Sequence, residues 1–369
     1  MRILILSGNT GGGHNSAAMA IKDYFSTKMA ECEIRDALAF WSEGKSYLIS
    51  NGHILIYKKV PKLFGVIYRF AEKHPAKEND DSFIYDVVTR GAKGLNEFLE
   101  KNRFDAIICT HVFAGMIATA VKKKYRPNLK IYFIATDYTC SPGVSEILMD
   151  GCFIPHEKLR HEFIRNRVPK EIIVASGIPV RAKFYEHTEP QKAREMLSLP
   201  TDKKLVLLMC GSMGCGPMKG LTKLLENTLP DDTHIAVICG SNKKLLKELS
   251  KRDQSDKVTL IGYTDKMPLY MDAADVALTK PGGLSTSEAL TKGVPLLLID
   301  AVPGCETRNI EFLCGNHFAE TGNNADELTA LVFSFIGKGD KAQKTRELLR
   351  KEFSDNAAQK IYDYIAKDL

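Results

Sequence analysis

Long hydrophobic runs are missing from this sequence. The longest, such as residues 206–209 and 296–299, have the length of strands and fall far short of the ~20 apolar residues that cross a membrane as a helix. We therefore expect no membrane-spanning helix. Residues 1–6 lead into a glycine loop without a small-residue cleavage site, so we also expect no signal peptide.

Cysteine pairs and two familiar nucleotide motifs are missing as well. The nine cysteines are an odd number and contain no Cys-x-x-Cys pair, which predicts reduced thiols in the cytoplasm and not a disulfide framework. The first glycine loop, at residues 8–13, is not a Gly-x-Gly-x-x-Gly fingerprint, and no Walker Lys-Ser/Thr follows it. The usual kind of dinucleotide binding and ATP hydrolysis are therefore not predicted.

Charge is not concentrated in any one part of the chain. The net charge of +6 is mild, and the basic residues are spread along a sequence without a nucleic-acid-binding motif, so we expect no nucleic-acid partner. A mild positive charge still permits contact with anionic lipid. The hydrophobic content of 44% and charged content of 26% are globular values, and 369 residues suit two domains.

The sequence does contain an α/β pattern that runs twice. Short apolar runs, which read as buried parallel strands, alternate with segments that read as helices, and the pattern restarts after a glycine and a proline at residues 177–179. We place the boundary there, giving domains 1–178 and 179–369. The predicted fold class is α/β with two Rossmann-like domains.

The richest stretch of the second domain begins at Lys280-Pro281-Gly282-Gly283, directly after the apolar run 275–278. Its glycines allow a sharp turn and leave room for a ligand. We expect Ser285 and Thr286 to cap the following helix, whose N–H groups and positive dipole end suit a phosphate. Glu288, one helical turn along, is placed to accept hydrogen bonds from a ribose diol. A plain βα connection is the alternative, but so many features in one unit favour a binding site.

Three other places in the second domain fit the same ligand. The glycine-rich turn that begins with Gly211 and Ser212 can surround phosphates with backbone N–H groups. Gly262 and Tyr263 follow a strand, where Tyr263 is either a ligand contact or a half-buried surface aromatic. A second Pro-Gly loop leads to Glu306 and Asn309, and Glu306 alone could merely complement a helix dipole.

The first domain carries its own candidate site. The strand at residues 2–7 ends in a loop with Gly11, Gly12, Gly13 and His14, and we expect the next helix to begin near Ala17. Histidine, with a reference pKa near ~6.5, suits the removal of a proton at neutral pH. Two further strand ends, at residues 110–111 and 136–138, should lie beside this loop. Asp137 there either caps its loop or orients and charges His14, and the sequence leaves both open.

Residues 41–75 interrupt the α/β pattern with aromatic and aliphatic residues mixed with lysine and arginine. This mixture fits an element that dips into lipid headgroups, and it fits equally well ordinary amphipathic helices whose lysines reach into water. The membrane candidates are Trp41, Lys58, Lys59, Phe64 and Tyr68.

The two glycine signatures resemble those of the MurG-like glycosyltransferases, and the nearest match is the branch that makes monogalactosyl- and glucosyl-diacylglycerol. One is Gly11-Gly12-Gly13-His14 and the other is the stretch 280–309, and the resemblance spans nearly the whole chain. It implies a GT-B fold, in which two Rossmann-like domains face each other across a cleft. It also implies that the terminal helix packs back on the first domain.

The resemblance assigns roles to individual residues. His14 is implied to be the base, Gly11, Gly12 and Gly13 to form the acceptor or phosphate loop, and 41–75 to bind acceptor and membrane. The implied nucleotide-sugar site consists of Gly211, Ser212, Gly262, Tyr263, Lys280, Pro281, Gly282, Gly283, Ser285, Thr286, Glu288, Glu306 and Asn309.

Two positions depart from the family pattern. Residues 139–142, with Ser141, stand where many members carry a histidine, and Cys305 replaces the glutamine of a Gln-Glu pair. These departures leave the donor open between glucose and galactose, and they leave the lipid acceptor open.

The prediction is therefore an inverting transfer of a hexose from a UDP-sugar to diacylglycerol or a related lipid, by a cytoplasmic protein held peripherally at the inner face of the cell membrane. The chain has no Asp-x-Asp sequence for a metal-bound diphosphate, so we expect no metal or other cofactor. Helix N-termini, glycine loops, Lys280 and Arg308 would carry that charge instead. The alternatives are a UDP-sugar enzyme with a soluble substrate, such as an epimerase, and a non-catalytic nucleotide-sugar sensor.

Overall fold

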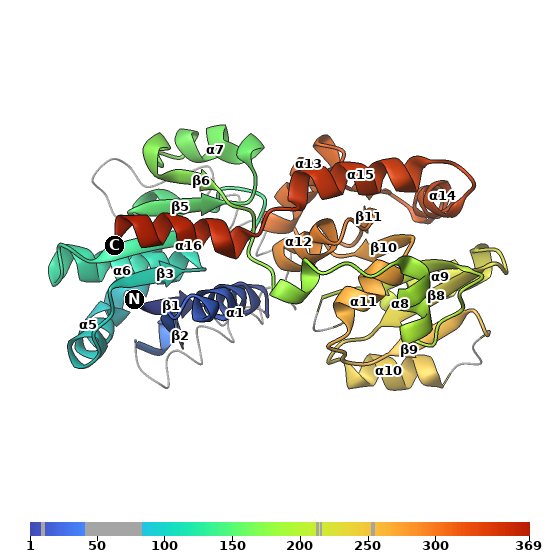
Figure 1. Ribbon diagram of the computed structural model, residues 1–369, viewed down its shortest axis with the longest axis horizontal. Coiled ribbons are helices and arrows are strands. Elements are labelled where there is room, and N and C mark those ends of the chain that lie inside the picture. Colours follow the sequence, from blue (N-terminus) through green and yellow to red (C-terminus); the bar gives the residue numbers. More distant parts are fainter. Residues whose placement is uncertain (9–11, 41–82, 212–213, 215, 252–254) are drawn as a thin grey trace. The chain divides into compact units, whose positions relative to one another are not determined.

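The computed structural model describes residues 1–8, 12–40, 83–211, 214, 216–251 and 255–369. It divides the chain into two compact units (Figure 1). The first contains Met1–Ala182, Val302–Arg308 and Asp355–Leu369, and the second contains Lys183–Ala301 and Asn309–Ser354. The division falls after Ala182, four residues beyond the predicted boundary. The membrane candidates Trp41, Lys58, Lys59, Phe64 and Tyr68, together with Gly11 and Ser212, lie outside the described residues.

The first unit is built on a six-stranded sheet of order β2-β1-β3-β4-β5-β6, with parallel pairing throughout. Its strands are β1 (Arg2–Ser7), β2 (Glu31–Asp36), β3 (Ala106–Cys109), β4 (Lys130–Ile134), β5 (Gly151–Ile154) and β6 (Ile173–Ala175). Its helices are α1 (Gly12–Thr27), α4 (Phe83–Val88), α5 (Ala92–Lys101), α6 (Val112–Lys124), α7 (Arg160–Arg165) and α16 (Ala357–Asp368). Short 3-10 turns are η1 (Ala37–Phe40), η2 (Thr89–Gly91), η3 (Val144–Glu146), η4 (Glu157–Leu159), η5 (Lys170–Ile172) and η6 (Ala182–Phe184), the last crossing the division.

The second unit repeats this architecture with the order β12-β11-β10-β7-β8-β9, again parallel. Its strands are β7 (Lys204–Met209), β8 (Thr233–Ile238), β9 (Val258–Ile261), β10 (Val276–Thr279), β11 (Leu296–Leu298) and β12 (Glu320–Thr321). Its helices are α8 (Pro190–Met196), α9 (Met218–Thr228), α10 (Lys243–Ser250), α11 (Met267–Ala273), α12 (Gly283–Thr291), α13 (Cys305–Gly315), α14 (Ala325–Ile336) and α15 (Lys341–Phe353), of which α13 begins in the first unit.

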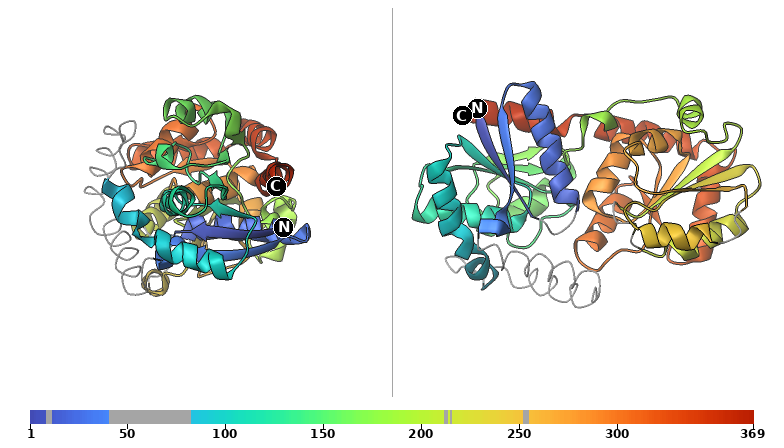
Figure 2. Two further views of the ribbon diagram at one scale, coloured as in Figure 1. Left: turned by 90° about the vertical axis from the view of Figure 1, so that its left-hand side faces the viewer. Right: turned by 90° about the horizontal axis from the view of Figure 1, so that it is seen from below.

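Continuous apolar strands form the two cores, as expected for parallel sheets covered by helices on both faces. In the first unit Ile3 and Ile5 of β1 are fully buried and pack with Ile361 and Ile365 of α16. The terminal helix therefore belongs to the first unit, and the two chain ends lie close together there (Figure 2). The end of α16 is fixed by Asp368, which accepts a 2.6 Å hydrogen bond from the Tyr132 hydroxyl.

Charged groups also hold the second unit together. Lys292, the C-cap of α12, is almost completely buried, and its Nζ lies 2.6 Å from Asp272 Oδ2 on α11. The same ammonium donates to the Glu186 carbonyl oxygen, and the Thr188 N–H donates to Asp272 at 3.1 Å. Burying an ion pair costs solvation, so this pair is stable only because both charges have several partners. It fastens the chain just after the unit boundary to α11 and α12.

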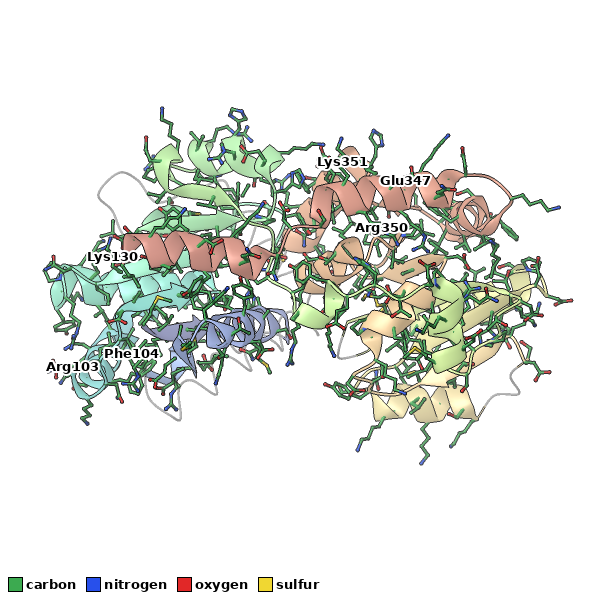
Figure 3. The ribbon with its side chains drawn as sticks, viewed as in Figure 1. Arg103, Phe104, Lys130, Glu347, Arg350 and Lys351 are labelled. Atoms are coloured by element: carbon green, nitrogen blue, oxygen red, sulfur yellow. The ribbon has the colours of Figure 1, made fainter. Side chains whose placement is uncertain are left out.

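Helix α15 closes over the same region. Gly293 has φ +71°, and a Cβ there would come within 3.0 Å of Arg350 Cγ, so glycine is required for both its backbone and its space. Figure 3 shows Arg350 on the side of α15 that faces α12, whereas Lys351 and Glu347 lie toward the outer side.

We expect Lys292→Met to lower the free energy of unfolding by about 3–5 kcal/mol, because it leaves the Asp272 carboxylate buried without its cation. Guanidinium unfolding, followed by fluorescence and circular dichroism, measures this. The double variant Lys292→Met/Asp272→Leu is the control and should regain much of the loss. An unchanged unfolding midpoint in the single variant would show that the pair contributes nothing.

Candidate functional site

One candidate site, in the first unit, lies at the carboxyl ends of β1, β3 and β4. Helix α1 begins at Gly12, earlier than expected, so His14 lies in its first turn. The Ser7 hydroxyl at the end of β1 donates to Asn15 Oδ1 at 2.6 Å, which fastens the start of α1 to its strand. His14 Nδ1 lies 2.8 Å from the Thr110 carbonyl oxygen and 2.9 Å from Thr136 Oγ1. The expectation that these strand ends lie beside the histidine is confirmed.

The Thr110 contact fixes the tautomer of His14. A carbonyl oxygen can only accept, so Nδ1 must carry the hydrogen, and Nε2 then holds the free lone pair. Burial lowers the pKa of His14 below its usual value, and the bond to the Thr110 carbonyl opposes that shift in part. The imidazole is therefore neutral at neutral pH, with one nitrogen able to accept a proton.

A second imidazole lies against His14. The ring of His111 is 4.7 Å from that of His14, centroid to centroid, with 75° between the planes. His111 is the N-cap of α6, and its Nδ1 accepts a hydrogen bond from the Phe113 N–H at 3.1 Å. The sequence predicts this strand end beside the glycine loop but assigns no role to His111. A histidine directly after a buried strand was the signal.

Asp137 follows Thr136 and is half-buried. The contacts that the structure gives to His14 Nδ1 come from Thr110 and Thr136, so a role of Asp137 in orienting the base stays a prediction. Asp137 does influence Cys305: burial first, and then the negative charges of Asp137 and Glu306, raise the pKa of the Cys305 thiol well above its usual value. Cys305 is therefore an uncharged thiol.

Glu306 differs in place from the prediction. Residues Val302–Arg308 group with the first unit, not with the second domain to which the sequence analysis assigned them. Glu306 is buried, and its Oε2 accepts a 2.7 Å hydrogen bond from the Val302 N–H, which closes the turn before α13. A sugar contact for Glu306 remains a prediction.

A second candidate site, in the second unit, surrounds the loop between β10 and α12. Helix α12 begins at Gly283 with Gly282 as its N-cap and no side-chain cap, so the expected capping by Ser285 and Thr286 is wrong. The helix starts three residues earlier than a cap at Ser285 would require, and both hydroxyl residues lie inside its first turns. The Thr286 N–H makes the first intrahelical bond, to Gly282 at 3.1 Å. The amides of Gly283 to Ser285 thus precede the intrahelical ladder and suit an anion.

Space for a ligand is present at two glycines of the second unit. A Cβ added at Gly282 or at Gly211 would meet no atom of the described chain within 4 Å. Gly211 has φ +65°, in the left-handed region that favours glycine. Among the described residues, the fully buried Thr286 hydroxyl has no hydrogen-bond partner, which is unusual in a folded protein.

Lys280 supplies positive charge beside this loop. Its Nζ lies 3.3 Å from Asp300 Oδ2, and Asp300, just beyond β11, has a left-handed backbone with φ +51°. A Cβ at Gly216 would approach the same carboxylate oxygen at 3.1 Å. Asp300 therefore links the ends of β10 and β11 and lies beside Gly216, which precedes α9. The sequence analysis missed it, although a charged residue after a buried strand could have indicated it.

Of the other residues predicted at the donor site, Asn309 makes a structural contact within the chain, whereas Tyr263 is exposed to solvent. Asn309 is completely buried, and its Nδ2 donates to the Pro281 carbonyl oxygen at 2.8 Å, so it holds the glycine loop in place. Glu288 is half-buried, and burial raises the pKa of its carboxyl to about 8, partly offset by the charge of Lys183. Tyr263, after the half-buried Gly262, is 77% exposed and available to a ligand.

Neither a metal centre nor a membrane-spanning helix is found among the described residues. Within them, no three or more His, Cys, Asp or Glu residues are grouped so that they could hold a metal ion. No helix in the described ranges combines the length and apolar character needed to cross a bilayer.

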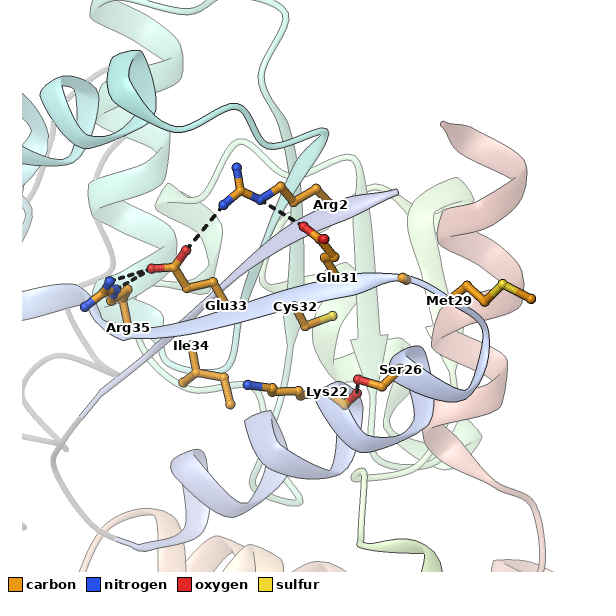
Figure 4. Close-up of a pocket in the computed structure, with 10 residues that line it drawn as sticks. Arg2, Lys22, Ser26, Met29, Glu31, Cys32, Glu33, Ile34 and Arg35 are labelled. Atoms are coloured by element: carbon orange, nitrogen blue, oxygen red, sulfur yellow. Dashed lines mark hydrogen bonds and ion pairs between the residues drawn. The ribbon is translucent and has the colours of Figure 1, made fainter.

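An open pocket of about 770 Å³ lies between α1 and β2 (Figure 4). It is lined by the C-terminal half of α1, away from His14 in the first turn. Arg2 and Arg35 are paired there with Glu31 and Glu33, so the charges of the pocket are largely matched. Because these charges are paired with each other, we do not assign a binding or catalytic role to this pocket.

Both halves of the chain match families of known glycosyltransferases. Residues 14–180 match the family described as monogalactosyldiacylglycerol (MGDG) synthase, and residues 192–355 match glycosyl transferases group 1. The processive diacylglycerol beta-glucosyltransferase of Bacillus subtilis is 24% identical over 375 residues, which cover all of this chain and 95% of that protein.

Solved structures show the same fold. MurG of Acinetobacter baumannii superposes with a TM-score of 0.64 and 14% identity, covering 99% of both chains. The Anabaena protein HepE, solved in complex with UDP-glucose, gives a TM-score of 0.58 and 13% identity over the full length of both chains. The predicted GT-B class, with two Rossmann-like domains, is thereby confirmed.

Both halves of the chain therefore match glycosyltransferases, and a relative that covers its whole length is named for diacylglycerol. The chain is a glycosyltransferase that is similar, over nearly its whole length, to the monogalactosyldiacylglycerol synthases and the processive diacylglycerol glucosyltransferases.

Proposed function

We propose that this glycosyltransferase moves a hexose from a UDP-sugar to diacylglycerol or a related membrane lipid, with inversion at the anomeric carbon and without a metal ion. The observation that carries the proposal is the state of His14. Its Nδ1 is committed to the Thr110 carbonyl, so Nε2 is left as a neutral base. An acceptor hydroxyl that loses its proton to Nε2 can attack the anomeric carbon in a single displacement.

The second unit supplies what the leaving nucleotide needs. The free amides at the start of α12 and the ammonium of Lys280 can stabilise the negative charge of a diphosphate. Glu288 can accept hydrogen bonds from the ribose, and HepE, which shares the fold, is solved with UDP-glucose. Asn309 holds the Pro281 loop in the shape that leaves room for the phosphates.

The acceptor assignment rests on the relatives. The family matched by residues 14–180 and the Bacillus relative are both named for diacylglycerol. A peripheral place at a membrane surface suits that acceptor, which resides in a bilayer, and the unpaired cysteines of the described residues favour the cytoplasmic face. Flotation of the protein with anionic vesicles tests this part separately.

Purified protein given diacylglycerol vesicles with UDP-glucose or UDP-galactose should make a glycolipid. We expect His14→Ala to lower the transfer rate by about 10²–10⁴-fold, the contribution of a general base, while UDP-sugar binding is kept. His161→Ala, which removes an exposed histidine of α7, is the matched control. Thin-layer chromatography of the lipid gives the rate, and calorimetry gives the binding.

If UDP-sugar binds and neither sugar reaches lipid, the donor half stands and the acceptor assignment is wrong. An epimerised nucleotide sugar in the same tubes would place the protein with the soluble enzymes. Binding without any turnover would identify a sensor.

The role of Lys280 is testable through affinity. We expect Lys280→Met to weaken UDP-sugar binding by about tenfold or more, because it removes a charge-assisted hydrogen bond to the diphosphate. Lys244→Met, at a lysine whose side chain is 86% exposed, should leave the affinity unchanged. A chelator should leave both binding and transfer at their untreated levels. A rate restored only by added divalent cation would contradict metal independence.

Binding of UDP-glucose should also depend on pH through Glu288. Below about pH 8 the carboxyl is protonated, so one of its oxygens becomes a donor and the group accepts more weakly from the ribose hydroxyls; above it, both carboxylate oxygens accept. The affinity should therefore rise as pH increases toward 8, by at most about tenfold per pH unit, and then level off. Glu288→Gln should bind with a nearly flat profile in calorimetry. The same slope in that variant would assign the titration to another group.

A further inference from the structure

His111 has no part in the mechanism above, although its ring lies beside the base. We propose that His111 is a positioning residue for His14: its uncharged ring packs against the imidazole of the base and fixes the direction of the Nε2 lone pair. The inference rests on the proposed function of His14.

The ring of His111 is held in its neutral form by α6. Its Nδ1 accepts the Phe113 N–H at 3.1 Å as the N-cap of the helix, so the hydrogen of the neutral ring lies on Nε2. Protonation at Nδ1 would break that cap and place a positive charge at the positive end of a 13-residue helix. His111 therefore adds bulk beside His14 without adding a charge that would repel an imidazolium.

The hydrogen bonds of His14 leave its ring able to rotate, and we infer that His111 restricts this rotation. The Thr110 carbonyl and the Thr136 hydroxyl hold only the Nδ1 side of the ring. The His111 ring lies 4.7 Å from the His14 ring, with 75° between their planes. In this position it limits rotation of the His14 ring about its Nδ1 contacts and shields the face of the ring that it covers from water. Two titratable groups of the described residues are placed near His14. The ring of His111 contacts the His14 ring, and Asp137 follows Thr136, whose hydroxyl bonds His14 Nδ1.

Gly8 makes room for this arrangement. A Cβ at Gly8 would stand 2.8 Å from His111 Cγ and 2.9 Å from Cδ2, closer than real contacts allow. The ends of β1 and β3 thus meet at the His111 ring. A methyl group at Gly8 displaces the ring without touching the chemistry of His111 itself.

Two variants separate the ring contact from the helix cap. His111→Asn keeps a good N-cap and removes the ring, whereas Gly8→Ala keeps the ring and displaces it. For both we expect kcat for glycolipid synthesis to fall by about 10–100-fold with the KM for UDP-sugar unchanged, because a misplaced base affects only the proton transfer. Gly8→Ala introduced into His111→Asn should cause no further loss, because the displaced ring is already absent.

A measurement without substrates tests the positioning directly. Titration of the ¹⁵N-labelled imidazoles by NMR, with the His14 signal assigned from His14→Ala, should show the pKa of His14 rising toward its usual value in both variants as water reaches the ring. The acid limb of the transfer profile should move to higher pH by the same amount. His161→Ala should change neither reading.

The inference is wrong if His111→Asn leaves the His14 titration and kcat as in the wild type, or if Gly8→Ala is equally damaging without the His111 ring. If the wild-type protein transfers no sugar but the variants still shift the His14 titration, positioning stands and the base role of His14 is wrong.

Discussion

Parallel pairing places the carboxyl ends of all strands of a sheet along one edge, and the candidate site of each unit depends on this constraint. In the first unit it brings Thr110 and Thr136, at the ends of β3 and β4, to the histidine in the first turn of α1. In the second it brings Lys280 and Asp300, at the ends of β10 and β11, to the same loop. Residues far apart in the sequence meet because each follows its own strand.

Much of the fold could be predicted because buried parallel strands are recognisable in the sequence as short continuous apolar runs. Continuous apolar runs predict the two α/β units. The segments that follow two of these runs contain His14, Lys280 and the glycines next to them, and this position identified them as candidate site residues. Helix starts were less predictable: α12 begins at Gly283 and α1 at Gly12, where glycine has a weak preference for helix. Their first turns are set by the strand before them, a tertiary effect that local propensity does not contain.

Side-chain partners were hardest to predict. Asn309 holds the Pro281 carbonyl, a contact that the sequence does not indicate, and its place at the ligand stays a prediction. Glu306, predicted in the second domain, closes a turn that groups with the first unit. Both are polar residues whose hydrogen bonds depend on a neighbour distant in sequence. His111 and Asp300 were overlooked because no spacing rule links them to His14 or Lys280; only the fold does. A single sequence identifies the chemistry of a side chain more readily than its partner.

Helix α16 has a consequence for how the chain is made. It fills the core of the first unit beside Ile3 and Ile5, and its Tyr362 packs on Phe25 of α1 with ring centroids 5.1 Å apart. During synthesis, the first sheet leaves the ribosome long before these residues exist, and the whole second unit is made in between. Domains generally fold in order from the N-terminus, but here the unit that starts first must finish last. Until the final helix arrives, one apolar face of α1 stays uncovered in the nascent chain.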